Sequence, residues 1–152
     1  MRARIYVDTS VIGGCLDDEF RDYSWALLRQ FAAGQATMLL SVLTLEELAQ
    51  APRGVRDVLD EVEEEHIETL PLTDATVELA DAYLDAAVVG PSMRSDAEHI
   101  AIATIARADV LVSWNFKHIV NLRRIHGFNS VNMRLGYPTL EIRSPREVLG
   151  DE

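Results

Sequence analysis

The feature that most constrains the fold is the alternation of short, β-rich apolar runs with longer segments of helical period. The predicted strands cover residues 5–7, 37–42, 67–70, 110–113 and 140–143. The predicted helices cover residues 22–33, 57–65, 73–87, 100–106 and 117–126, with further helix starts at Thr44 and Ser144. Strands that alternate with helices are typical of βαβ units, whose strands run parallel. The pattern therefore predicts an α/β fold, a three-layer sandwich around a mainly parallel central sheet.

Helix ends are predicted from capping patterns. Residues 44–47 and 95–98 have the capping-box form, a hydroxyl followed three residues later by an acid. Residues 144–147 combine a serine, a proline and a glutamate, which predicts a last short helix. Gly34 and Gly127 are expected behind two helix ends, because glycine adopts the left-handed conformation easily.

Composition indicates a single domain over residues 1–152, since 48% of the residues are hydrophobic and no repeat or linker is visible. The one cysteine, Cys15, excludes a disulfide within the chain and a cysteine-cage zinc site, and fits a reducing compartment. The longest uncharged stretch, residues 30–45, is too short and too polar to span a membrane. No secretory signal follows Met1, so we expect a cytoplasmic protein without membrane contact.

The net charge of −11 is unevenly distributed along the chain. Residues 57–98 carry 13 acids and 1 base, whereas residues 110–140 contain no acid at all. The net negative charge argues against strong non-specific binding of polyanions. The acid-free stretch still allows a local site that binds phosphates. The acidic block either docks a basic partner or is simply a solvated helix face.

Oxygen-bearing side chains follow the predicted strands where each one ends. Asp8 ends the first strand, Glu46 and Glu47 follow the second, Asp96 lies in the first turn of the apolar helix, and Asn115 follows the strand at 110–113. Carboxyl ends of parallel strands meet at one edge of a sheet, where function gathers. Clustered carboxylates repel unless a cation neutralises them, and hard oxygen ligands suit Mg²⁺ or Mn²⁺. The sequence thus predicts a site for metal-assisted phosphodiester hydrolysis.

Each of these residues also has a purely structural interpretation. Asp8 and Asn115 could be turn residues, Glu47 could be only the acid of a capping box, and any carboxylate is favoured in a first helical turn. The metal hypothesis depends on their combination at successive strand ends.

Four motifs in this order resemble those of the PIN-domain ribonucleases, particularly the VapC-type toxins of prokaryotic toxin–antitoxin pairs. They read IYVDTSVI at residues 5–12, SVLTLEEL at 41–48, DAEHIAIA at 96–103 and ADVLVSWNFKHI at 108–119. The resemblance covers most of the chain and implies a PIN-like fold.

The resemblance implies a ribonuclease whose metal centre, holding Mg²⁺ or Mn²⁺, consists of Asp8, Glu47, Asp96 and Asn115. The resemblance places the family's glutamate at Glu47 rather than Glu46. Adjacent helix residues point about 100° apart, so only one of the two is expected to face the cleft. It also implies an RNA substrate, a homodimer and a cognate antitoxin. Nucleic acid is expected to contact Lys117, Arg123 and Arg124.

The sequence departs from the family pattern at residue 118, which is a histidine. Many members have an aspartate where this chain has His118, which either contacts a phosphate or metal or has no chemical role. His99 lies three residues after Asp96, and we expect it to be a packed core histidine rather than a metal ligand. Thr9, Ser10 and Ser113 either orient a carboxylate or only cap a turn.

Two other functions are weighed against the nuclease. The neutral Asn115 and the replaced acid at His118 are compatible with a degraded PIN-like domain that only binds RNA or protein. A phosphoacceptor domain also gathers acids at strand ends, but it needs a lysine at a late strand end, and the chain has only Lys117, just past Asn115. Walker, dinucleotide-binding and serine-esterase motifs are absent from the sequence.

Overall fold

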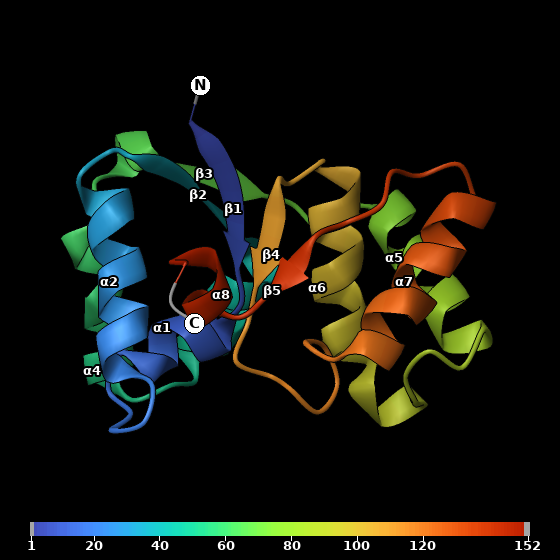
Figure 1. Ribbon diagram of the computed structural model, residues 1–152, viewed down its shortest axis with the longest axis horizontal. Helices are drawn as coiled ribbons and strands as arrows, with labels where there is room; N and C mark the ends of the chain where they lie inside the picture. Colours follow the sequence, from blue (N-terminus) through green and yellow to red (C-terminus); the bar gives the residue numbers. More distant parts are fainter. Residues whose placement is uncertain (1, 151–152) are drawn as a thin grey trace.

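The computed structural model describes residues 2–150, in which five parallel strands form one sheet (Figure 1). The strands are β1 (Ala3–Val7), β2 (Ala36–Ser41), β3 (Ile67–Leu70), β4 (Val110–Val112) and β5 (Ile142–Arg143). Their order across the sheet is β3-β2-β1-β4-β5, and every neighbouring pair is parallel. Each strand lies within two residues of a predicted one, so the predicted parallel sheet is confirmed.

Helices cover both faces of this sheet (Figure 1). One face carries α1 (Thr9–Gly14), α2 (Arg21–Ala32), α3 (Val42–Ala49), α4 (Arg53–Asp57) and α8 (Pro145–Val148). The other face carries α5 (Asp74–Asp85), α6 (Arg94–Ile105) and α7 (Leu122–Arg134). The three-layer sandwich is therefore confirmed.

The alternation of side chains along β1 divides the core between the two faces. Ile5 and Val7 belong to one buried cluster, together with residues of α1 and α2. Tyr6 points the other way, into a second cluster that is rich in residues of α5 and α6. Seven residues of α6 are buried, as expected for a central apolar helix.

Two predicted helix starts are wrong, because other residues provide the ends. Helix α3 begins at Val42 rather than Thr44, since the Ser41 hydroxyl accepts from the Thr44 amide at 3.1 Å. Helix α6 begins at Arg94, and the Ser95 hydroxyl does not cap it but donates to Glu47. The capping box predicted at Ser144 is present.

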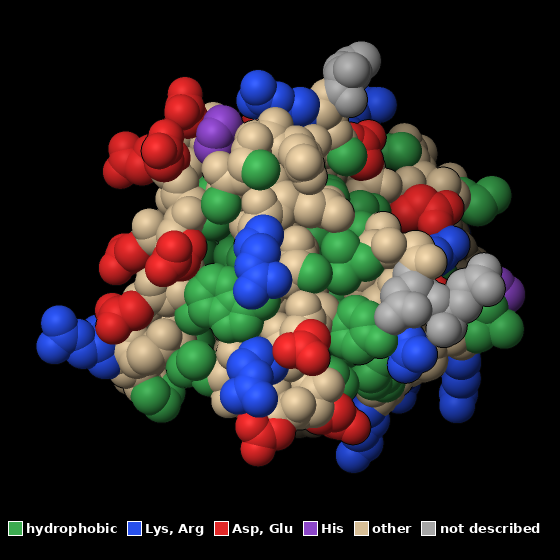
Figure 2. Space-filling model, turned by 60° about the vertical axis from the view of Figure 1, so that its left-hand side comes forward, with side chains coloured by type: hydrophobic (Ala, Val, Ile, Leu, Met, Phe, Trp, Pro, Cys, Tyr) green, Lys and Arg blue, Asp and Glu red, His purple; other side chains and the backbone are tan. Residues whose placement is uncertain are grey.

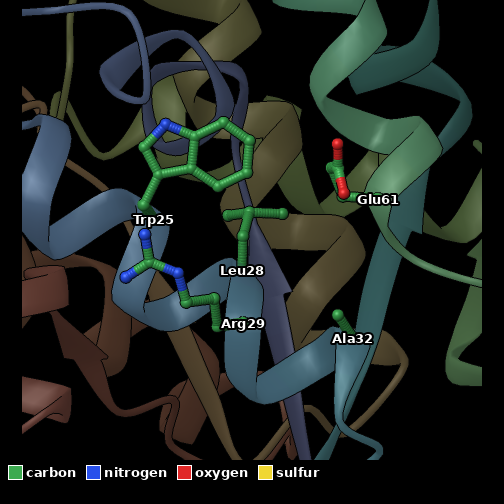
Figure 3. A pocket seen from close by; sticks show the side chains of 5 residues that line it. All are labelled: Trp25, Leu28, Arg29, Ala32 and Glu61. Carbon is green, nitrogen blue, oxygen red and sulfur yellow. The ribbon is translucent and has the colours of Figure 1, made fainter.

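The acidic stretch 57–65 does not form the predicted amphipathic helix. It divides between the end of α4 and two short 3₁₀ helices, η1 (Val58–Glu61) and η2 (Glu64–His66). Like charges this dense destabilise a continuous helix, and only Val58 and Val62 of the stretch are fully buried. Figure 2 shows acidic side chains gathered along one edge of the molecule.

The helix predicted at residues 117–126 begins later and runs further. Asn121 caps α7, accepting from the Arg124 amide at 3.0 Å, and Lys117 lies in the loop before it. Contrary to the prediction, Gly127 does not follow a helix end but lies inside α7. Its missing side chain allows close packing on Val88, since a Cβ there would meet Val88 Cγ1 at 2.8 Å. Gly34 has the predicted left-handed conformation, with φ +73°.

Within residues 2–150, the helices are too short or too polar for any of them to cross a membrane.

Candidate active site

The sheet brings the four predicted site residues to a common edge. Asp8 follows β1 directly and caps α1, a short helix that was not predicted from the sequence. Glu47 lies on α3, which begins where β2 ends, and Asn115 lies three residues past β4. Since β1 is flanked by β2 and β4 and all three are parallel, their carboxyl ends adjoin. Asp96 reaches the same edge from the first turn of α6.

Asp8 is a buried carboxylate, 5% exposed, held by two serines. Ser10 donates to its Oδ1 and Ser113 to its Oδ2, each at 2.6 Å, and the Val11 amide donates to Oδ1 at 3.3 Å. Burial raises the pKa of Asp8, although these hydrogen bonds and the charge of His99 oppose the shift. The orienting role considered for Ser10 and Ser113 therefore has a geometric basis.

Glu47 contacts three polar side chains, whereas Glu46 is exposed. Thr9 donates to Glu47 Oε1 at 2.6 Å, His99 Nε2 lies 2.8 Å from the same oxygen, and Ser95 donates to Oε2 at 2.9 Å. Partial burial alone would raise the pKa of Glu47. The hydrogen bonds from His99 and Thr9, with the charge of His99, outweigh it and lower that pKa to about 2. Glu47 is thus the glutamate that faces the site.

His99 joins Glu47 to the core. Its side chain is buried, as predicted, with the residue 3% exposed. Its Nδ1 lies 2.6 Å from the Tyr6 hydroxyl, which in turn lies 2.8 Å from Ser41 Oγ. A carboxylate only accepts hydrogen bonds, so His99 Nε2 donates to Glu47. The packed histidine is as predicted from the sequence, whereas its contact with Glu47 was not predicted.

Asp96 lies between Asn115 and His118. The Asn115 amide nitrogen is 3.4 Å from Asp96 Oδ1, and His118 Nδ1 is 3.1 Å from Oδ2. Burial raises the pKa of Asp96, opposed by the charges of His118 and His99. The side-chain oxygen Oδ1 of Asn115 accepts from the backbone amide of His118 at 2.9 Å. Within residues 2–150, His118 Nε2 is buried without a hydrogen-bond partner.

The donor set fits a hard divalent cation. Each carboxylate of Asp8, Glu47 and Asp96 keeps at least one oxygen lone pair uncommitted after the hydrogen bonds above are counted. In the described part of the chain, these carboxylates pair with no lysine or arginine, only with histidines at Glu47 and Asp96. Carboxylates that are buried or partly buried and have no permanently charged partner are the charge arrangement that a metal ion neutralises.

The three carboxylates do not form a compact cage. Over residues 2–150, the only three acidic, cysteine or histidine side chains with ligand atoms all within 4.8 Å of one another are Glu63, Glu65 and His66. That cluster precedes β3 and so lies at the opposite, amino edge of the sheet. Mg²⁺ keeps several waters and needs direct contact with only one or two carboxylates. An open set at the carboxyl edge therefore suits it.

The three basic residues expected to contact nucleic acid have different surroundings. Lys117 is exposed in the loop after Asn115, and Arg123 is exposed on the first turn of α7. Arg124 is half-buried and donates from Nη1 to the Val88 carbonyl. Lys117 and Arg123 are consequently more accessible to a phosphate backbone than Arg124.

Two solved structures share this fold at low sequence identity. One is a chain from the crystal structure of VapBC2 from Rickettsia felis bound to a DNA fragment from their promoter. It has a TM-score of 0.57 and 15% identity, covering 93% of this chain and 98% of that chain. The other, from the crystal structure of FitAcB from Neisseria gonorrhoeae, has a TM-score of 0.57 and 14% identity over 93% and 97% of the two chains. No family model and no curated protein matches the sequence. The likeness confirms the predicted PIN-like α/β fold.

Proposed function

We propose that this chain is a metal-dependent endoribonuclease that hydrolyses RNA phosphodiester bonds, and that it is the toxin of a toxin–antitoxin pair. The observation that carries the proposal is the set of three carboxylates at the carboxyl edge of the sheet, with no lysine or arginine paired to them in residues 2–150. The fold adds support, since it is shared with chains of the VapBC2 and FitAcB toxin–antitoxin complexes.

Asp8, Glu47 and Asp96 would hold Mg²⁺ or Mn²⁺, with Asn115 contributing the remaining lone pair of its amide oxygen. Such a cation supplies a water of lowered pKa and neutralises charge on the phosphate oxygens. Its ligands are arranged by the protein: Ser10 and Ser113 fix the Asp8 carboxylate. A pKa of about 2 keeps Glu47 ionised at neutral pH, ready to bind a cation.

The hydrogen bonds around Glu47 orient it as well as ionise it. Thr9 and His99 both approach Oε1, while Ser95 approaches Oε2. The second oxygen therefore keeps a lone pair for the site. The exposed Lys117 and Arg123 are suited to guide the RNA backbone toward this edge.

The proposed partners follow from the same likeness. A cognate antitoxin is expected because the two structures named above are toxin–antitoxin complexes. A homodimer and a cytoplasmic location are proposed from the family resemblance in the four motifs.

One observation favours the alternative of a degraded binding module. His118 stands 3.1 Å from Asp96 and occupies one of its oxygens, whereas the resembling family often has an acid at that position. Metal affinity separates the two functions, because a binding module has no need to take up Mn²⁺.

The deciding experiment is cleavage of a mixed-sequence single-stranded RNA with Mn²⁺, with EDTA, and by the Asp96→Asn and Glu47→Gln variants. Glu46→Gln is the matched control, since Glu46 is exposed on the same helix. We expect metal-dependent cutting that is lost in both site variants and kept in the control. Full activity in Asp96→Asn would overturn the site, and absent cleavage together with absent Mn²⁺ binding would favour the binding module.

A further inference from the structure

An aromatic surface begins directly beside the candidate metal site. Trp114 and Phe116 flank Asn115 in the sequence. The Trp114 ring stacks on Phe20 with centroids 4.2 Å apart and planes inclined by 19°. Phe116 and Tyr23 approach Trp114 edge-on, at 6.2 and 6.3 Å. The surface thus joins the loop after β4 to the start of α2.

Two adjoining hollows connect this surface to the site. The first, of about 420 Å³, includes Ser10 and Asn115 of the candidate site. The second, of about 330 Å³, is lined by Glu19, Phe20, Tyr23, Trp114, Phe116, Ser144 and Arg146. Phe20 and Trp114 line both, so the stacked pair is the wall between the metal site and the aromatic hollow.

The wall is rigid while its rim is open. Trp114 is 8% exposed, and its indole Nε1 donates to Ser24 Oγ at 2.9 Å. Gly14 allows this close packing, because a Cβ there would lie 2.8 Å from Trp114 Nε1. Phe116, by contrast, is 49% exposed. The exposed Phe116 ring lies beside the Trp114–Phe20 stack. A planar ligand that stacked on Phe116 would cover its exposed apolar surface.

We propose that the aromatic hollow binds one base of the RNA substrate, close to the phosphodiester that is cut, with Phe116 stacking on that base. The inference rests on the proposed nuclease function and names part of its substrate site. The volume of the aromatic hollow lies at the small end of the range for ligand pockets, about 300–1,000 Å³, which suits a single base. Aromatic side chains bind unstacked RNA bases in this way.

Polar and charged side chains lie among the aromatic rings of the hollow, which suits a nucleobase better than an apolar peptide segment. The Arg146 guanidinium lies 5.5 Å from the Tyr23 ring centroid, and Lys117 follows Phe116 in the chain. The exposed Lys117 suits a phosphate next to a base that stacks on Phe116. Ser144 and Glu19 supply polar groups that can hydrogen-bond the edge of the base.

The test measures binding of a labelled single-stranded RNA, with Mn²⁺ present, in an Asp96→Asn background that does not cut. Adding Phe116→Ala should weaken the affinity by about 5- to 150-fold, the usual cost of losing one base–aromatic stack. Phe116→Tyr should restore the affinity, because it keeps the ring. Met133→Ala, which removes another exposed apolar side chain on α7, should leave the affinity unchanged.

RNAs that lack a single base at successive positions provide the second arm. At one position in the RNA, removal of the base should lower the affinity of Asp96→Asn for the RNA. The same removal should not change the affinity of the double variant Asp96→Asn/Phe116→Ala, which has already lost the stacking ring. Asp96→Asn and the double variant could instead bind RNA with equal affinity while wild type still cuts RNA. That result would overturn the base-binding role of the hollow but not the nuclease function, and a peptide would become the alternative ligand. Wild type that neither binds nor cuts RNA would overturn the proposed function as well.

Discussion

His99 Nε2 donates to Glu47 Oε1 across 2.8 Å, and this contact connects a metal-site candidate to the buried core. The other nitrogen of the same ring lies 2.6 Å from the hydroxyl of Tyr6, a residue of β1. His99 also acts electrostatically on Asp8 and Asp96. One buried side chain on α6 therefore influences all three carboxylates.

His99→Ala is accordingly expected to weaken Mn²⁺ binding by about 10- to 100-fold, the usual effect of removing a hydrogen-bond partner of a metal ligand. It should also lower the free energy of unfolding by about 1–3 kcal/mol, since Tyr6 and Glu47 lose a partner. Isothermal titration with Mn²⁺ and urea unfolding measure the two effects. His126→Ala, an exposed histidine on α7, is the control. Unchanged Mn²⁺ affinity in His99→Ala would contradict the positioning role.

Asp8→Asn is expected to abolish cleavage without lowering the stability of the metal-free protein. Burial disfavours the charged carboxylate of Asp8, and an amide of the same shape removes that cost. Asparagine also caps helices well, so α1 keeps its start. Thermal unfolding without metal should give an equal or higher melting temperature than wild type.

The same pair of proteins should respond differently to Mn²⁺. A ligand at 100 times its dissociation constant stabilises a protein by about 2.7 kcal/mol. For a chain of this length, that corresponds to a rise of about 5–10 °C in melting temperature. Wild type should show the rise and Asp8→Asn should not. Equal shifts in both proteins would place the cation elsewhere, with the Glu63, Glu65 and His66 cluster the first alternative.

The lowered pKa of Glu47 predicts that the folded protein loses stability in acid. Its pKa is lowered to about 2 in the folded chain, against 4.5 for an ordinary glutamate. A lowered folded-state pKa contributes stability that is fully present above pH 4.5 and is lost as the pH falls toward 2. Urea unfolding between pH 6 and pH 3 should show a smaller decline in Glu47→Gln than in wild type. Parallel declines in the two proteins would contradict the shift.

Local signals predicted the fold well, and tertiary contacts account for what they missed. The cap at Ser144 and the strand at 67–70 depend on neighbouring residues in the chain, and both are present. The predicted start at Thr44 failed because Ser41, at the end of β2, provides an earlier cap. Ser95 was expected to cap α6, but Glu47, 48 residues away, takes its hydroxyl.

The site follows the same division. The strand-end positions of Asp8, Glu47 and Asn115 could be predicted, because parallel strands place their carboxyl ends together. The contacts of His99 with Tyr6 and Glu47 join residues 93 and 52 positions apart. No spacing in the sequence indicates such pairs.

Gly14→Ala tests the packing behind the aromatic wall. The added Cβ would lie 2.5 Å from Ser24 Oγ and 2.8 Å from Trp114 Nε1, distances too short for real contacts. We expect a loss of about 1–3 kcal/mol in the free energy of unfolding, the usual cost of overpacking. Gly13→Ala on the same helix has nothing within 4 Å of its Cβ and should be neutral or stabilising. Equal stabilities of the two variants in urea unfolding would contradict the packing argument.

His118→Asp should make the site more dependent on metal. His118 Nδ1 lies 3.1 Å from Asp96 Oδ2, so a carboxylate at that position would face a second negative charge. Like charges this close destabilise the metal-free protein, whereas a divalent cation binds more tightly as carboxylates are added around it. The variant should therefore melt below wild type in EDTA and show a larger rise with Mn²⁺. His118→Ala, which adds no charge, should show no larger rise than wild type. A smaller rise in His118→Asp than in wild type would instead indicate that the His118 imidazole itself binds the metal.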